Sequence, residues 1–364
     1  MKFIVTKWNI KKLHDTYKKD LLDLSPPYQR NFIWSITDQR YLIDSIGKSN
    51  PIPNFFLLQK DDDTLEMVDG QQRSRTILSF VEHQFTDLNN KLFSTTLYPN
   101  FWKYEFPVTI ITDIEGESIE RFYAIVNKTG VHLNKPEVRK ADYYDTVLLN
   151  LVNEITESKK FKLLKVFSES SLKRMNDTEF VSELIVLIKK GHVDKKNHLD
   201  EYFKSDITKD DAAEIKAKFS MILDKVNYLN SYSELVKTRY KQRNDFYTLF
   251  DFISSNPTVS QDILLEFYKV LLLIADDIKP SQNDCIPLRD YARNCVTQSN
   301  SKAARESRLN FFDSLFLNKN KKPNQVQKEI LDFYGLPHSR VRIFKTFLTI
   351  DSAALANVKK IVLA

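Results

Sequence analysis

A short polar segment near the start of the chain has the residue types that phosphate chemistry uses. We refer to it as the 69–73 motif, which consists of Asp69, Gly70, Gln71, Gln72 and Arg73. A guanidinium is a planar fork that matches a phosphate, and carboxamides orient a water molecule or read a base edge. A carboxylate would repel a bare phosphate, so Asp69 indicates a bridging Mg²⁺ or a general base. The alternative is a tight turn whose polar side chains cap a helix and form surface ion pairs.

The elements around the motif would place it at the junction of a strand and a helix. Residues 65–68 alternate apolar with polar side chains, which is typical of a half-buried strand. Apolar residues at 77, 78, 80 and 81 then recur at helical spacing. A helix that begins after Gly70 would offer free backbone N–H groups to an anion. Gly70 has no Cβ, so it would also let a ligand approach the backbone.

A second segment upstream is stiffened by two prolines. Pro26 and Pro27 favour an extended backbone, from which Tyr28, Gln29 and Arg30 would project. Such a segment suits a ligand-reading arm. The alternative is a connector whose aromatic residues, Tyr28 and Trp34, pack on the core, and for these two side chains we favour the core.

The rest of the first 145 residues predicts a mixture of strands and helices. Thr37 would cap a helix that ends at Gly47. Further predicted elements are a strand at 55–58, an acidic hairpin turn at 61–63, a strand at 106–111 and a helix at 119–126 that ends near Gly130. Beyond that helix, a turn would bring together Asn127, Glu137 and Arg139, although asparagines also commonly cap helices.

From residue 143 onward the pattern becomes helical, with clear apolar faces at 180–188 and 264–272. We therefore predict an α+β domain over residues 1–145 and a mainly α-helical domain over 146–364. A polar stretch at 192–200 contains His192 and His198, but its length and lysines favour a solvated loop over a metal site.

Composition excludes several classes of protein. The chain has 364 residues, 42% hydrophobic and 28% charged, which suits two globular domains. No apolar run approaches the roughly 20 residues that span a bilayer, and the N-terminus lacks a signal-peptide core. Cys285 and Cys295 have no metal-ligand spacing around them. We expect a cytosolic chain with two free thiols, with a disulfide as the alternative.

The net charge of +6 permits nucleic-acid binding without requiring it. The basic residues are concentrated between 316 and 346, where aromatic side chains are interleaved with them. This composition suits a phosphate-facing surface, and a merely solvated face is the alternative. The candidate DNA-binding residues are Lys319, Lys321, Lys322, Arg340 and Arg342.

Three ordered blocks resemble a known family. They are 27–30, the 69–73 motif, and 127–139 with Asn127, Glu137 and Arg139. Together they are similar to the N-terminal domain of the GmrSD-type modification-dependent restriction proteins, over roughly residues 10–145. The resemblance implies a ParB/sulfiredoxin-like α+β fold that binds and hydrolyses a nucleoside triphosphate. It also implies a role in bacterial defence against foreign or modified DNA.

One departure from the family limits the resemblance. Two-domain relatives carry a C-terminal His-Asn-His nuclease domain, which needs clustered histidines. After residue 145 this chain has only His192, His198 and His338, without such a cluster. The resemblance therefore implies a sensing and nucleotide-handling chain that works with a separate nuclease chain.

Three functional hypotheses follow. In the first, the chain hydrolyses a nucleoside triphosphate in response to DNA. Its catalytic residues would be Asp69, which also binds Mg²⁺, with Gln71, Gln72 and Arg73. Its nucleotide-binding residues would be Tyr28, Gln29, Arg30, Gly70, Asn127, Glu137 and Arg139. In the second hypothesis the same pocket cuts DNA. In the third the chain is a DNA-binding or regulatory subunit without catalysis.

Overall fold

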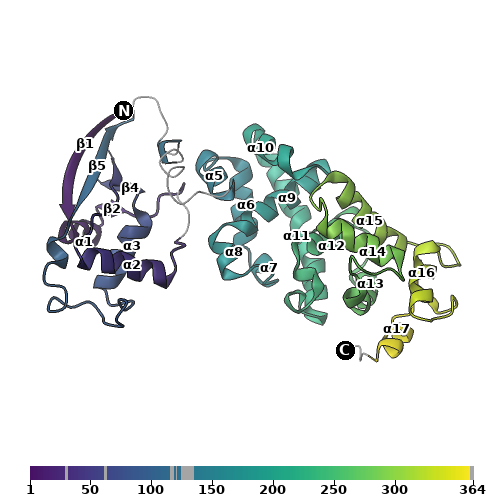
Figure 1. The fold of residues 1–364 in the computed structure, drawn as a ribbon. Coiled ribbons are helices and arrows are strands. Elements are labelled where there is room, and N and C mark those ends of the chain that lie inside the picture. The colour runs from purple at the N-terminus through teal and green to yellow at the C-terminus, as the bar shows by residue number, and fades with distance from the viewer. Residues whose placement is uncertain (29–31, 61–63, 115–118, 120, 124–134, 361–364) are drawn as a thin grey trace. The chain divides into compact units, whose positions relative to one another are not determined.

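A computed structural model describes residues 1–28, 32–60, 64–114, 119, 121–123 and 135–360 (Figure 1). The side chains of residues 135, 141 and 195–198 are not described. The chain divides into two compact units: unit 1 is Met1–Tyr144 with Glu169–Asn176, and unit 2 is Asp145–Ser168 with Asp177–Ala364. The predicted boundary after residue 145 lies beside this division, which also assigns a short later segment to unit 1.

Unit 1 is built on a five-stranded mixed sheet with the order β1-β5-β3-β4-β2. Its strands are β1 (Lys2–Asn9), β2 (Leu22–Asp23), β3 (Phe55–Gln59), β4 (Leu65–Asp69) and β5 (Glu105–Asp113). β1 pairs antiparallel with β5, and β3 antiparallel with β4, whereas β3 with β5 and β2 with β4 are parallel. The described helices of unit 1 are α1 (Ile10–Lys18), α2 (Ile36–Gly47), α3 (Gln71–Val81), the 3₁₀ turn η1 (Phe101–Lys103), α5 (Lys135–Asp142) and α8 (Glu169–Lys173).

The sheet buries apolar side chains on both faces, because neighbouring residues of a strand point to opposite sides. Leu57 and Met67 belong to the larger core, which α1, α2 and α3 cover. Leu58 and Val68, the next residues along the same strands, belong to a smaller core with Tyr28. The end of β4 before Asp69 is therefore held by apolar packing on both faces of the sheet. On the neighbouring strand β3, the pairing register with β4 shifts between Phe56 and Leu57.

Unit 2 is mainly helical (Figure 1). Its elements are α6 (Val147–Glu157), α7 (Lys159–Lys162), α9 (Asn176–Lys190), α10 (Lys195–Ser205), α11 (Lys209–Tyr232), α12 (Arg243–Ser255), α13 (Gln261–Ile274), α14 (Ile286–Val296), α15 (Lys302–Phe316), α16 (Gln325–Phe333), α17 (Ser352–Lys359), the 3₁₀ turns η2 (Leu235–Lys237), η3 (Arg239–Lys241) and η4 (Ala275–Asp277), and the hairpin strands β6 (Val341–Phe344) and β7 (Phe347–Ile350).

α12 is the centre of unit 2, because all residues from 245 to 254 are buried. A helix that is covered on all sides needs partners for its polar side chains, and α12 carries Asp245, Thr248 and Asp251. Aromatic rings surround it; Phe250 lies 4.8 Å from Phe219 between ring centroids.

The predicted fold class is confirmed: an α+β region is followed by a mainly helical one. The strands at 55–58, 65–68 and 106–111, and the helices that carry 180–188 and 264–272, are present. Cys285 and Cys295 are free thiols, and burial raises their pKa values to about 11 and about 12. Among the described residues, no helix has both the length and the apolar character that crossing a membrane requires.

Several local predictions are wrong. The cap of α2 is Ser35, whose hydroxyl accepts from the Asp38 amide while Asp38 bonds back to the Ser35 amide; Thr37 lies inside the helix. The expected loop at 192–200 becomes α10 from Lys195 onward. β1 and the β6–β7 hairpin were not predicted. The acidic turn at 61–63 lies outside the described residues, as do residues 120 and 124–126 of the predicted helix at 119–126. Residues 119 and 121–123 of that helix are helical.

Candidate functional site

The 69–73 motif lies where β4 passes into α3. β4 ends at Asp69, Gly70 takes φ +116°, and α3 begins at Gln71 without a side-chain cap. A Cβ on Gly70 would overlap the ring of Phe55, so both the left-handed backbone and this neighbour require glycine. The sequence suggested that Gly70 makes room for a ligand; the structure adds that it makes room for Phe55.

Arg73 is buried, and both terminal nitrogens of its guanidinium have hydrogen-bond partners. It donates to the backbone carbonyls of Pro53 and Asn54 and to Asp69 Oδ2, the last at 2.8 Å. It also stacks over the Phe55 ring, with 4.5 Å between the guanidinium carbon and the ring centroid. Burial lowers the pKa of Arg73, and the carboxylate of Asp69 opposes that shift. Arg73 therefore joins the chain before β3 to the start of α3.

Gln71 and Gln72 are also buried and hold a different part of the chain. The Gln71 amide nitrogen donates to the carbonyl of Leu24 at 2.8 Å. The Gln72 amide oxygen accepts from the backbone N–H groups of Ile33 and Trp34, at 2.9 and 3.2 Å. These carboxamides satisfy backbone groups that would otherwise be unpaired near the core.

Hydrogen bonds therefore hold the 24–34 segment at both of its ends, at Leu24 and at Ile33 and Trp34. Besides the two glutamines, Arg75 donates to the Ser25 hydroxyl, and the buried Tyr28 hydroxyl donates to Glu66 of β4. Tyr28 and Trp34 pack on the core, as predicted for these aromatic rings. Gln29 and Arg30 lie outside the described residues, between the fastened ends. The motif thus holds both described ends of the 24–34 segment.

Asp69 differs from its neighbours because its side chain is 29% exposed. One oxygen, Oδ2, binds Arg73, while Oδ1 has no hydrogen-bond partner in the described part of the chain. Mg²⁺ in nucleotide sites is held by one or two carboxylates together with phosphate oxygens and water, so an accessible carboxylate oxygen fits such an ion. Across the described residues, no group of three or more His, Cys, Asp or Glu side chains could hold a metal by itself.

The third predicted block is only partly described. Asn127 lies outside the described residues, whereas Glu137 and Arg139 are buried in α5. Glu137 forms an ion pair with Arg174 at 3.2 Å, in the later segment that belongs to unit 1. Sequence reasoning missed Arg174, because a lone arginine in a helical region carries no signal. Whether Asn127, Glu137 and Arg139 complete a pocket with the 69–73 motif stays a prediction.

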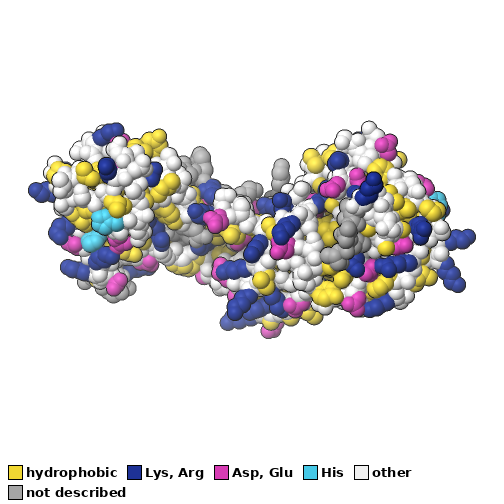
Figure 2. Space-filling model, turned by 90° about the horizontal axis from the view of Figure 1, so that it is seen from below, with side chains coloured by type: hydrophobic (Ala, Val, Ile, Leu, Met, Phe, Trp, Pro, Cys, Tyr) yellow, Lys and Arg dark blue, Asp and Glu magenta, His cyan; other side chains and the backbone are white. Residues whose placement is uncertain are grey.

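The basic stretch of unit 2 separates into two sets. Arg342 forms an ion pair with Glu266, and Lys345 lies 3.2 Å from Asp262, so α13 neutralises both. Lys319, Lys321, Lys322 and Arg340 are exposed, and no carboxylate of the described residues lies within ion-pair distance of them. We call these four residues the basic end. Figure 2 shows that Lys and Arg side chains are spread over the visible face with acidic residues among them. The two sets of basic residues are therefore distinguished by their ion pairs and not by their location on this face.

The basic end is a local cluster. The Leu348 amide donates to the Asn318 carbonyl at 2.7 Å, which seats the 318–322 loop on β7. Arg340 precedes β6, and its carbonyl accepts from the Asp351 amide just beyond the other end of β7. Because a strand rises about 3.3 Å per residue, the two attachment points at 348 and 351 lie on the order of 10 Å apart along the chain.

Two histidines of unit 2, His192 and His338, have acidic partners. His192 Nε2 lies 2.5 Å from Asp251 Oδ2, and His338 Nε2 lies 2.8 Å from Asp332 Oδ1. These two pairs belong to different elements, and the side chain of His198 is not described. The described residues therefore contain no cluster of the His-Asn-His kind.

Residues 10–144 match a family model described as the GmrSD restriction endonuclease N-terminal domain. This range contains the 69–73 motif, the fastened 24–34 segment and α5. The segment is a GmrSD-type N-terminal domain, as the three sequence blocks predicted. Searches of curated proteins and of solved structures give no match to the chain. The expected ParB/sulfiredoxin likeness of the fold accordingly stays a prediction.

Proposed function

We propose that the chain acts in a restriction-type defence against foreign or modified DNA, and that its N-terminal domain binds and hydrolyses a nucleoside triphosphate. The match over residues 10–144 to a restriction endonuclease domain supports the first part. The observation that supports the second is the setting of Asp69: one accessible carboxylate oxygen stands beside the uncapped start of α3, surrounded by buried side chains that are already engaged.

The geometry suggests a division of roles within the motif. Asp69 would be the group that touches the reactants, either by holding Mg²⁺ or by accepting a hydrogen bond from the attacking water. Gln71, Gln72 and Arg73 would be positioning residues, since their polar atoms bind backbone groups of 24–34 and 53–54. Positioning supplies much of the rate in phosphoryl transfer. Bound Mg²⁺ would neutralise charge on the phosphates.

The remaining pocket residues are assigned by the same reasoning. Gln29 and Arg30 would contact the nucleotide from the stiff segment, whose ends the motif fixes. Asn127 and Arg139 would close the opposite side. In the hydrolysis, water attacks the terminal phosphorus, the bond to the leaving diphosphate breaks, and the proton of the water passes to Asp69 or to a phosphate oxygen.

Phosphate release tests this proposal. The full chain would be incubated with each common nucleoside triphosphate and Mg²⁺, with and without plain or modified DNA. Asp69→Asn keeps an acceptor for Arg73 but removes the charge, and Asp44→Asn, in the ion pair with Lys48, is the matched control. Turnover that only Asp69→Asn abolishes would support the proposal, whereas equal turnover in both variants would contradict it. Nicked DNA in the same reactions would instead favour the endonuclease hypothesis.

DNA binding is assigned to the basic end of unit 2, because these four cations lack acidic partners among the described residues. Neutralising Lys319, Lys321 and Lys322 together should weaken the salt dependence of DNA binding. The slope of log K against log salt concentration should fall in magnitude by about 2–3, since each phosphate contact contributes about 0.9. The control is Lys345→Gln, whose lysine already faces Asp262. An unchanged slope in the triple variant would remove DNA binding from this surface.

A further inference from the structure

Unit 2 contains a cavity of about 150 Å³ whose lining is rich in arginine. The charged groups in its wall are Arg243, Arg305, Arg308 and Glu183. They come from α9, α12 and α15, and Asn244 and Tyr247 of α12 add polar atoms. We call this space the arginine cavity. It belongs to unit 2, so it is distinct from the 69–73 motif of unit 1.

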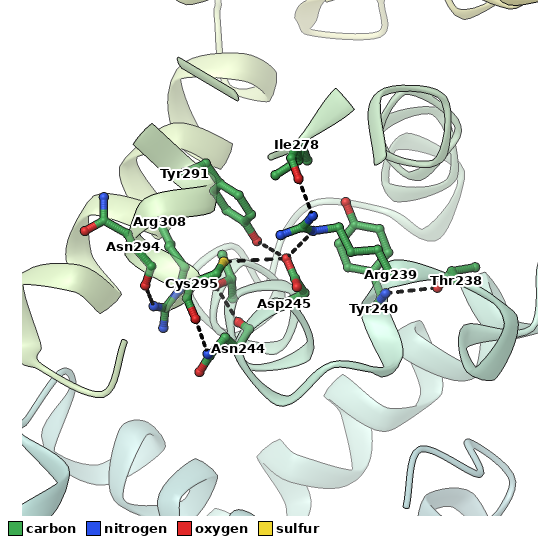
Figure 3. Close-up of polar contacts among 11 residues, drawn as sticks. Thr238, Arg239, Tyr240, Asn244, Asp245, Ile278, Tyr291, Asn294, Cys295 and Arg308 are labelled. Atoms are coloured by element: carbon green, nitrogen blue, oxygen red, sulfur yellow. Dashed lines mark hydrogen bonds and ion pairs between the residues drawn. The ribbon is translucent and has the colours of Figure 1, made fainter. Parts of the chain in front are cut away.

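Arg308 is the least compensated of these groups. Its side chain is 0% exposed, and it donates to the Thr248 hydroxyl at 3.0 Å and to the carbonyls of Asn294 and Ser299. Figure 3 shows the guanidinium beside Asn294 and Asn244. Its Nη2 atom is buried without a hydrogen-bond partner, and no carboxylate of the described residues lies within ion-pair distance of it.

The other two arginines share one acid. Glu183 accepts from Arg305 at 2.6 Å and from Arg243 at 3.3 Å. Arg305 is buried over the Tyr247 ring, at 4.3 Å from its centroid. The cavity wall therefore carries three guanidinium groups and one carboxylate.

The nearby buried acid on α12, Asp245, acts on Arg308 only through space, because no hydrogen bond or ion pair joins the two side chains. Asp245 accepts from Arg239 Nε at 2.8 Å and from the Tyr291 hydroxyl at 2.9 Å, on the other side of Cys295 from Arg308 (Figure 3). Asp245 is therefore matched by its own arginine. Asp251 likewise has a partner of its own, His192.

A buried guanidinium without a counter-charge is costly unless an anion accompanies it. Arginine forks match the oxygens of a phosphate, and 150 Å³ accommodates one tetrahedral oxyanion but not a nucleoside beside it. Arg243, with 40% of its side chain exposed, and the exposed Asn300 lie at the mouth, whereas Arg305 and Arg308 form the floor. We propose that the arginine cavity binds a tetrahedral oxyanion, namely inorganic phosphate or the terminal phosphate of a nucleic acid.

Calorimetric titration of the full chain would test this proposal. Inorganic phosphate would be added against chloride of matched ionic strength, followed by short oligonucleotides with a 5′-phosphate or a 5′-hydroxyl. Arg243→Gln removes a cation at the mouth, where folding depends on it least. Lys241→Gln, an exposed cation two residues away that does not line the cavity, is the matched control. Arg308→Lys keeps the floor charge but loses the fork.

We expect the unmodified chain to bind one phosphate. Arg243→Gln should bind it at least about tenfold more weakly, because about one charge-assisted hydrogen bond is lost. Lys241→Gln should bind as the unmodified chain does. Binding confined to the 5′-phosphate oligonucleotide, with the same dependence on Arg243, would support the proposal and identify the source of the phosphate. Absence of saturable binding by either probe, or equal binding by Arg243→Gln, would overturn it. Arg308→Lys, if folded, should also weaken binding.

Discussion

Two buried arginines, Arg73 in unit 1 and Arg308 in unit 2, solve the same physical problem differently. Arg73 faces a carboxylate and two carbonyls, so its charge and its fork are both satisfied within the domain. Arg308 meets a hydroxyl and two carbonyls but no carboxylate among the described residues, and one nitrogen lacks a partner. In the roles that we propose, Arg73 positions other residues, whereas Arg308 binds an anion.

The tightest constraint on the first region is Gly70. Gly70→Ala should destabilise unit 1 by about 4 kcal/mol, because a strained backbone and an overpacked core each cost roughly 1–3 kcal/mol. Gly335 is the matched control: it also has positive φ, at +64°, but no atom lies within 4 Å of an added Cβ. Gly335→Ala should therefore cost only about 1 kcal/mol. Denaturant unfolding measures both, and equal costs would show that the contact with Phe55 does not matter.

Removing each arginine would sharpen the comparison directly. Arg73→Gln leaves Asp69 and the carbonyls of Pro53 and Asn54 without their donor, so we expect a loss of about 3 kcal/mol. This loss should be the same with and without phosphate. The deficit of Arg308→Gln should instead grow when phosphate is added, since only the unmodified chain gains binding energy. Thermal melting at several phosphate concentrations measures both losses. If the Tm deficits of the two variants changed with phosphate in the same way, Arg308 would not differ from Arg73 in binding an anion.

A smaller effect is expected at Asp313, which lies on the same helix as Arg308. Burial, and then the charge of Asp251, raise its pKa to about 6. A carboxyl group with a raised pKa in the folded state destabilises the fold above pH 6, and the penalty disappears as the pH falls below its ordinary value. Asp313→Asn should therefore raise Tm by about 3 °C at pH 7.5 and have no effect at pH 4. The control is Asp290→Asn, because the side chain of Asp290 is half exposed. An equal rise in Tm at pH 4 and at pH 7.5 would show that the effect does not come from the raised pKa of Asp313.

Sequence reasoning succeeded where the information is local. The alternation before Asp69 and the helical spacing after Gly70 were enough to place β4 and α3. The Ser35–Asp38 capping box was also present in the sequence, and overlooking it shifted the start of α2. β1 was missed because Phe3, Ile4 and Val5 form a continuous run with no alternation, and all three are exposed.

The roles of the glutamines could not be read from the sequence. Gln71 and Gln72 bind backbone atoms of Leu24, Ile33 and Trp34, about forty residues away. A carboxamide that pairs with a distant backbone leaves no pattern. The arginine cavity did leave one, because Arg305 and Arg308 share the face of α15 that carries Phe312. Cations on an apolar face at helical spacing indicate either buried ion pairs or a ligand.

The central claim is that Asp69 acts on the nucleotide while its neighbours position the chain. The most direct measurement is DNA-stimulated turnover of Asp69→Asn and Gln72→Ala, each with its melting curve. We predict that Asp69→Asn loses turnover by about a hundredfold or more at temperatures where it is folded. Its Tm should also fall, because the buried Arg73 loses its counter-charge. Gln72→Ala, which releases two backbone amides, should lower Tm and raise KM. Wild-type turnover in a folded Asp69→Asn protein would contradict the account.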